Sequence, residues 1–351
     1  MSRFQISPFD VGTASAECWA AFHVHRRAIA TELYPDEPIE SDAECEYEMQ
    51  RPNRLAEARR WLAFDGPDIV GAASAWLRRA DAPNAADYAR FLGCHGSVLA
   101  AARRKGIGTQ LLRQVHALMH SLDKSILTMS AHTDGGHAFL MQAGATAKHC
   151  SVESRALLAD LDWPCLRAWE DAAADLGLTW ECYAGRVPRE ALVQLLPALT
   201  PLVSDMPRGA LEAPPIRLEI ESYDQWYESL DRTEGAHYLV LLRAPDGAVA
   251  GMSEAAWDNQ SPKIAYQAFT AVAKPWRGRG LARAAKAAIL RQIRAAHPGA
   301  EEISTNNAES NTPILSINKR LGFGVRRRYV DYQITRAELD ARLPAAGETA
   351  S

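Results

Sequence analysis

A basic, glycine-rich turn occurs twice in this chain, once in each half. The second copy is Arg277-Gly278-Arg279-Gly280-Leu281-Ala282 and the first is Arg103-Arg104-Lys105-Gly106-Ile107-Gly108, so both follow the pattern R-x-x-G-x-[G/A]. A valine stands five residues before each first arginine, and an Ala/Leu-rich stretch follows each turn. A strand, a glycine-rich turn and a helix start together form an anion site, because backbone N–H groups converge at the positive end of the helix. The repeat therefore predicts two related domains, each with a turn for a phosphorylated cofactor.

The second copy is the stronger anion site. Gly278 and Gly280 allow close approach of the backbone, and Arg277 and Arg279 add charge-assisted hydrogen bonds. A single copy would fit a basic, exposed helix start equally well, but two copies in matching contexts favour the anion site. The third glycine and downstream acid of a dinucleotide-binding fingerprint are missing, and no Gly-Lys-Ser/Thr of a P-loop occurs. The pattern therefore argues against a nucleoside triphosphatase.

Composition places the chain among ordinary globular proteins. Its 351 residues are 47% hydrophobic and 23% charged, with a net charge of −4, so no nucleic-acid or membrane partner is expected. The start of the sequence lacks the apolar core of a signal peptide, and no stretch has the length of a membrane span. The six cysteines form no C-x-x-C pair, which predicts reduced thiols in a cytoplasmic protein without a bound metal.

Each half is predicted to contain the same order of elements around its turn. Strand Tyr88–Ala100 and helix Thr109–Ser121 flank the first turn, and strand Ile264–Val272 and helix Leu281–Ala296 flank the second. The expected organisation is an N-terminal domain over 1–160, a connecting helix over 161–177, a C-terminal domain over 178–343 and a disordered tail over 344–351. The fold class is α/β (α+β), with a mixed twisted sheet flanked by helices in each domain.

The second half resembles the GNAT superfamily of N-acetyltransferases. The segment Thr270–Ala282 is similar to the acyl-CoA signature of that superfamily, and Thr305–Asn311 and Ile317–Phe323 match the segments that follow it. Together with Tyr266-Gln267, they resemble the second domain of bacterial tandem-GNAT proteins, the architecture of mycothiol synthase. The first half, with Arg103–Gly108 and Gly144, resembles the companion domain. The resemblance covers nearly the whole chain and implies two GNAT-type domains packed as a pseudo-dimer, in a monomer or a homodimer.

The resemblance also implies which residues bind CoA. In such enzymes the strand before the turn bonds the pantetheine arm and the turn binds the pyrophosphate. This assigns Thr270, Ala271 and Val272 to the arm, Arg277, Gly278, Arg279, Gly280, Leu281 and Ala282 to the pyrophosphate, and Asn311 and Asn318 to the thioester end. For Asn311, helix capping is an equal alternative. The same transfer predicts a second CoA site from Gly96, Ser97, Val98, Arg103, Arg104, Lys105, Gly106, Ile107 and Gly108.

The reaction implied is direct transfer of an acyl group, expected to be acetyl from acetyl-CoA, to a small amine in the C-terminal domain. It needs a base, because the ammonium group of an amine has a pKa of about 10, and N–H donors for the oxyanion, for which Val272 is suited. Two alternatives stay open: catalysis in the N-terminal domain, with His95 as its base, and a non-catalytic acyl-CoA-binding or sensing protein.

The catalytic groups depart from the family pattern. Many members carry a carboxylate on the strand before the turn and a tyrosine four residues before the glycine of the LGF-like segment; here the strand has no carboxylate and the second position is Asn318. A hairpin around Asn259–Lys263 that pairs Asp258 with Ile264 places Glu254 opposite Ala268, on the face of Tyr266 and Thr270. Glu254 is therefore the candidate base, with a solvent-facing role as the alternative.

Three further residues are assigned to the reaction or to the acceptor. Tyr266 is a candidate acid, with packing as its alternative. Asp205 lies in a segment that matches a family loop beside the acceptor pocket, where it either pairs with a cationic acceptor or caps the loop. Gln267 is assigned to the acceptor together with Asp205.

Overall fold

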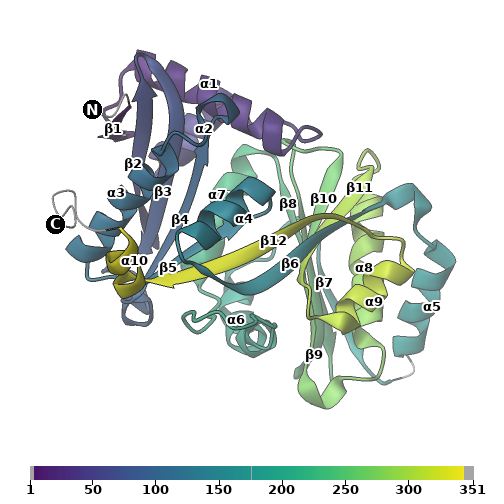
Figure 1. Ribbon diagram of the computed structural model, residues 1–351. Helices are drawn as coiled ribbons and strands as arrows, with labels where there is room; N and C mark the ends of the chain where they lie inside the picture. The colour runs from purple at the N-terminus through teal and green to yellow at the C-terminus, as the bar shows by residue number, and fades with distance from the viewer. Residues whose placement is uncertain (1–3, 175, 344–351) are drawn as a thin grey trace. The chain divides into compact units, whose positions relative to one another are not determined.

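The structure is a computed structural model that describes residues 4–174 and 176–343, and these residues form two compact units. Unit 1 comprises residues 4–148, 211–214 and 330–343, and unit 2 comprises residues 149–210 and 215–329, apart from residue 175. Each unit contains its own set of strands with helices on both faces (Figure 1). The predicted α/β class with two tandem domains is confirmed. The tail expected to be disordered lies outside the described residues.

In unit 1, the sheet has the order β1-β2-β3-β4-β5 followed by the end of β12. Neighbouring strands are antiparallel, except that β4 and β5 are parallel. The strands are β1 (Gln5–Pro8), β2 (Ala56–Asp65), β3 (Asp68–Arg78), β4 (Phe91–Val98), β5 (Ile126–Ala131) and β12 (Gly324–Thr335). The helices are α1 (Ala16–Leu33), α2 (Asp42–Gln50), α3 (Ile107–Ser121), α4 (Asp134–Gln142) and α10 (Arg336–Arg342).

In unit 2, the sheet has the order β6-β11-β10-β9-β8-β7, in which only β10 and β11 of these described strands are parallel neighbours. The strands are β6 (Thr146–Leu157), β7 (Thr179–Tyr183), β8 (Ala236–Arg243), β9 (Val249–Trp257), β10 (Ile264–Val272) and β11 (Glu302–Ala308). The helices are α5 (Trp163–Ala174), α6 (Arg189–Ser204), α7 (Ile220–Arg232), α8 (Leu281–Ala296) and α9 (Thr312–Arg320). None of the described helices of either unit is long and apolar enough to cross a membrane.

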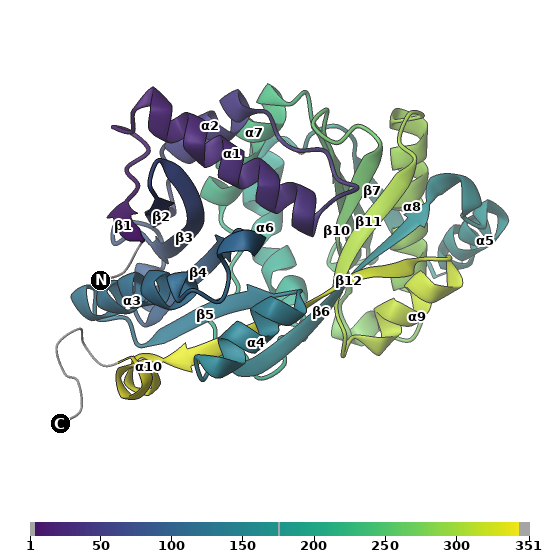
Figure 2. The ribbon, with the colours of Figure 1, turned by 45° about the horizontal axis from the view of Figure 1, so that its top comes forward.

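The last strand of each sheet comes from the other half of the sequence. Residues 330–335 of β12 pair with β5 in unit 1, and residues 151–157 of β6 pair with β11 in unit 2. Because of this exchange, each unit is discontinuous in sequence. The predicted domain boundaries at 160/161 and 177/178 stay predictions. The region expected to connect the domains forms α5, which packs beside α8 in unit 2 through an ion pair of Glu170 with Arg291 at 2.8 Å (Figure 2).

Alternation along β8 divides the core of unit 2 into two layers. Leu239 and Leu241 pack with α6 and α7, whereas Val240 packs with α8 and α5, and all three are at most 1% exposed. Successive side chains of a strand point to opposite faces, so the same division holds for the neighbouring strand β9. Its residue Ser253 therefore faces α8, and Glu254 faces α6 and α7.

Candidate functional site

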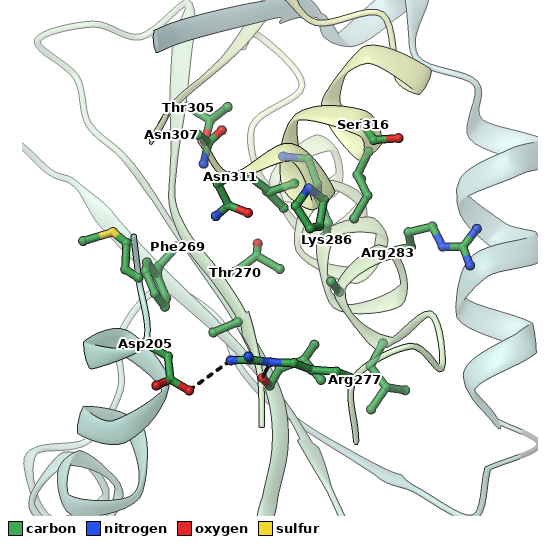
Figure 3. A pocket seen from close by; sticks show the side chains of 18 of the residues that line it. Asp205, Phe269, Thr270, Arg277, Arg283, Lys286, Thr305, Asn307, Asn311 and Ser316 are labelled. Atoms are coloured by element: carbon green, nitrogen blue, oxygen red, sulfur yellow. Dashed lines mark hydrogen bonds and ion pairs between the residues drawn. The ribbon is translucent and has the colours of Figure 1, made fainter. Parts of the chain in front are cut away.

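The sheet of unit 2 opens beside the second glycine-rich turn. β10 pairs with β11 over Ile264–Gln267, and its register with β9 shifts between Gln267 and Phe269, which is the mark of a β-bulge. Beyond the bulge, β10 continues along β9 while its other edge borders a cavity of about 770 Å³. The cavity is lined by β10, the end of β11, the start of α8, helix α9, and the end of α6 with the loop after it (Figure 3). Its volume is typical of small-molecule sites.

The turn at one end of this cavity has the conformation that an anion site requires. Gly278 and Gly280 have φ of 78° and 82°, in the left-handed region that favours glycine, and Gly280 caps α8. Among the described residues, none apart from the two chain neighbours has an atom within 4 Å of a Cβ placed on Gly278, so a ligand has room to approach the backbone. The first N–H groups of α8, those of Leu281 and Ala282, point out of the helix end, where the helix has its positive partial charge. The turn therefore fits a phosphate or pyrophosphate group.

Arg277 joins the turn to the strand and to the loop after α6. Its Nε donates to the carbonyl oxygen of Val272 at 3.1 Å, and its guanidinium lies 3.0 Å from Asp205 Oδ2 (Figure 3). Lys274 Nζ lies 3.1 Å from the other carboxylate oxygen. The bond from Lys274 is the main reason that the pKa of Asp205 lies below its ordinary value, with Arg277 contributing. The carboxylate of Asp205 thus already pairs with two cationic side chains of this chain. Its contact with a cationic acceptor stays a prediction.

Most residues assigned to CoA in unit 2 line this cavity. They are Thr270, Ala271, Val272, Arg277, Gly278, Gly280, Leu281, Ala282 and Asn311. Arg279 is not among the lining residues, and its guanidinium lies over the ring of Trp276 at 4.9 Å. Asn311 occupies the N-cap position of α9 without a capping bond from its side chain, which leaves the amide directed at the cavity (Figure 3).

Asn318, assigned to the thioester end, lies behind the cavity wall. Its side chain is 2% exposed, and its Nδ2 donates to Oδ1 of the cavity-lining Asn307 at 2.8 Å. Its own Oδ1 is buried without a hydrogen-bond partner among the described residues. The role of Asn318 toward a thioester stays a prediction, and any action on a ligand would pass through Asn307.

The register predicted for the β9–β10 hairpin is wrong beyond Gln267. Glu254 lies opposite Phe269 and not opposite Ala268, because the bulge inserts one residue into β10. One inserted residue turns the following side chains to the other face. Glu254 therefore shares its face with Tyr266, as expected, but not with Thr270, which lies opposite Ser253.

Glu254 belongs to a polar cluster on the face of α6 and α7. Its Oε1 accepts from the hydroxyl of Tyr223 at 3.3 Å and lies 2.9 Å from Nε2 of the fully buried His237, a contact that lacks hydrogen-bond geometry. Nδ1 of His237 lies 2.8 Å from the hydroxyl of Tyr227. Burial, and then the charge of Glu254, raise the pKa of Tyr223 above its usual range. The Glu254 side chain is 14% exposed and lies next to the cavity-lining Phe269, so it is not a free surface carboxylate.

The cavity wall contains a buried lysine that the sequence analysis missed. Lys286 on α8 is 1% exposed; its Nζ donates to Gln267 Oε1 and lies 4.6 Å from the ring centre of Phe323. Gln267, assigned to the acceptor, is 3% exposed, and its side chain lies on the α8 side of β10, where it accepts the hydrogen bond from Lys286. A signal was present in the sequence, since Lys286 is flanked by alanines and lies three and seven residues before Ile289 and Ile293, on the buried stripe of α8.

Lys286 gives the stability of the fold a pH dependence with a defined sign. Burial lowers its pKa to about 7 in the folded protein, whereas a lysine of an unfolded chain has a pKa of about 10.4. Between these values the unfolded chain binds the extra proton, so this group makes the free energy of unfolding rise with pH, by at most about 1.4 kcal/mol per pH unit. Urea titrations should show the unmodified protein gaining stability relative to Lys286→Met from about pH 7 to about pH 9. A difference that stays constant over this range would contradict the prediction.

The first glycine-rich turn, in unit 1, repeats the geometry of the second. Gly106 has a φ of 84° and caps α3, and Arg104 stands at φ 61° where the second turn has Gly278. Arg103 Nε donates to the carbonyl oxygen of Val98 at 3.0 Å, and its guanidinium lies 2.6 Å from Glu32. Both turns therefore fix their first arginine between the preceding strand and an acidic residue.

The side chains of Phe139 and His25 make the surroundings of the first turn different from those of the second. The ring of Phe139 would lie 3.1 Å from a Cβ on Gly108, whereas the corresponding Ala282 lines the open cavity of unit 2. The hydroxyl of Ser97 lies 3.0 Å from Nε2 of the buried His25. A second CoA site in unit 1 stays a prediction.

The chain belongs to the acetyltransferase (GNAT) family. The family model matches it twice, over residues 20–142 and 203–323, which together exceed half of the chain. The protein is therefore an N-acyltransferase with two tandem GNAT domains that uses acyl-CoA, and the resemblance noted in the sequence is confirmed. No match was found among curated proteins.

Solved structures show the same fold at low sequence identity. A tandem GNAT protein from the clavulanic acid biosynthesis pathway is 21% identical, with 95% of this chain and 98% of that chain covered and a TM-score of 0.70. A GCN5-related N-acetyltransferase from Sphaerobacter thermophilus is 18% identical, with 96% of both chains covered and a TM-score of 0.62. The N-myristoyltransferase of Saccharomyces cerevisiae, solved with myristoyl-CoA, is 12% identical, with 95% and 80% covered and a TM-score of 0.55.

Proposed function

We propose that unit 2 transfers an acetyl group from acetyl-CoA to a small amine. One observation carries this proposal: a single cavity joins the left-handed glycine turn at the start of α8 to the edge of β10 that is not paired with β11. The turn fits the pyrophosphate of CoA, and the free strand edge fits its pantetheine arm. We therefore propose the C-terminal domain as the site of catalysis.

The backbone around the cavity supplies the binding groups. N–H groups of residues 278–282 and the guanidinium of Arg277 hold the pyrophosphate. Along residues 268–272, alternate N–H groups point away from β9 and are available to the arm and to the thioester oxygen. The bound thioester supplies an activated acyl carbonyl.

The proton from the amine is proposed to pass to Glu254. An ammonium group with a pKa of about 10 has to lose a proton before it can attack, and a carboxylate beside the cavity can accept it directly or through a water. The hydroxyl of Tyr223 donates a hydrogen bond to this carboxylate, and His237 lies beside it. Tyr266, on the same face as Glu254, is the proposed acid for the leaving thiolate.

A thiol-release assay tests the function. The full chain is incubated with acetyl-CoA and a panel of amines that includes amino sugars, amino-acid derivatives and polyamines, and free CoA thiol is measured. The proposal predicts amine-dependent release with at least one class of acceptor. Tight binding of acetyl-CoA without release on any amine would contradict it and would favour the acyl-CoA-sensing alternative.

A further inference from the structure

A connected set of four polar side chains crosses from α8 to β9 and β10 and ends at the cavity. Lys286 donates to Oε1 of Gln267, and Nε2 of Gln267 donates to Ser253 Oγ and Thr270 Oγ1, both at 3.0 Å. Ser253 Oγ lies 2.9 Å from Thr270 Oγ1 and donates to the carbonyl oxygen of Phe269 at 3.2 Å. The first three side chains are at most 3% exposed, whereas Thr270 is only partly buried and stands at the centre of the cavity (Figure 3).

Lys286 determines which way the amide of Gln267 faces. An ammonium group has three N–H donors and no acceptor, so Gln267 has to present its oxygen to Lys286 and its Nε2 to the two hydroxyl groups. In the described part of the chain, Nζ contacts this oxygen and the ring of Phe323. The orientation of the Gln267 amide thus follows from the donor-only character of the Lys286 ammonium group.

The amide orientation in turn decides what Thr270 offers to a ligand. With Nε2 facing the hydroxyl groups, both hydroxyl oxygens accept from Gln267, and Ser253 donates its one hydrogen to Phe269. The hydrogen of Thr270 is then free to turn from Ser253 toward the cavity. A reversed amide would take both hydroxyl hydrogens, and Thr270 would present only lone pairs.

We infer that Lys286 is a positioning residue of the acyl-CoA site, which through Gln267 makes the Thr270 hydroxyl a hydrogen-bond donor to a carbonyl of bound acyl-CoA. The inference rests on the proposed function of unit 2. The arm and thioester of an acyl-CoA carry carbonyl oxygens that only accept hydrogen bonds, so a fixed donor on the cavity wall complements them. The buried Lys286 then orients the Gln267 amide in addition to packing in the core of unit 2.

A double-mutant cycle on acetyl-CoA affinity tests the inference. Calorimetric titrations at pH 6, where Lys286 is an ammonium group, compare Thr270→Val, Gln267→Glu and the double variant. Gln267→Glu keeps the side-chain shape but offers an acceptor to Thr270, so the hydroxyl turns away from the cavity. Each single variant is expected to bind acetyl-CoA about fivefold to tenfold more weakly, and the double variant no more weakly than either.

Two further variants guard against misfolding and a purely structural role. Thr270→Ser keeps the hydroxyl and should bind like the unmodified protein. Lys286→Met should weaken binding when Thr270 is present and have no effect in the Thr270→Val background, which a packing role would not produce. Additive effects, or normal affinity in both Gln267→Glu and Lys286→Met, would overturn the inference. Failure of the unmodified protein to bind acetyl-CoA would instead overturn the proposed function.

Discussion

Gly278→Asp is expected to lower the affinity for CoA about a hundredfold, equivalent to about 2.8 kcal/mol. Gly278 stands at φ 78° with open space where its side chain would be, at the start of the proposed pyrophosphate turn. Asp tolerates left-handed backbone better than most residues, so the fold should persist. Its carboxylate would occupy the space for the phosphate, repel its charge and compete for Arg277. Calorimetric titration of CoA measures the effect, with circular dichroism to confirm the fold.

A matched pair of controls separates charge from shape and one turn from the other. Gly278→Asn has nearly the same side chain without the charge and should retain most of the affinity that Gly278→Asp loses. Arg104→Asp places the same carboxylate at the corresponding position of the first turn, where the residue already has a φ of 61°. This variant should leave the affinity of the second site unchanged. If Arg104→Asp and not Gly278→Asp abolished binding, the site would have to be moved to unit 1.

Glu254→Gln is expected to lower kcat about a hundredfold to a thousandfold while leaving the affinity for acetyl-CoA unchanged. The amide cannot accept the proton of the amine, but it has the same shape and can still accept the hydrogen bond from Tyr223. Stopped-flow or steady-state thiol release with the best acceptor of the panel measures kcat.

Tyr223→Phe is the control for Glu254→Gln. It removes the hydroxyl that holds the carboxylate and keeps the ring in the core of α6 and α7, so a loss of less than about tenfold is expected if Tyr223 only positions Glu254. Thiol release at an unchanged rate in Glu254→Gln would remove Glu254 from the mechanism.

The sequence predicts the turns well because their geometry restricts the residues that fit. Left-handed φ at Gly278, Gly280 and Gly106 favours glycine, and the flanking strand and helix have clear hydrophobic periodicity. Apart from Arg279, the residues assigned to the arm and the turn line the cavity. The fold class could be predicted because the strands and helices show this hydrophobic periodicity.

Three features could not be predicted, each for a physical reason. The exchange of the ends of β6 and β12 leaves no local mark, because the pattern of a strand shows which face it buries and not which strand it pairs with. The bulge at Ala268 changes the face of Thr270 relative to Glu254, and alanine gives no signal for it. The position of Lys286 on the buried stripe of α8 can be read from the sequence, but its hydrogen bond to Gln267 on β10 cannot, because lysine usually stays at the surface.

A crystal structure of the full chain with bound CoA would locate the cofactor site. We expect the CoA pyrophosphate on the backbone N–H groups of residues 278–282, with Arg277 beside it and the pantetheine arm along residues 268–272 of β10. CoA bound only at the turn of residues 103–108, or in unit 2 away from the start of α8, would contradict the proposed site.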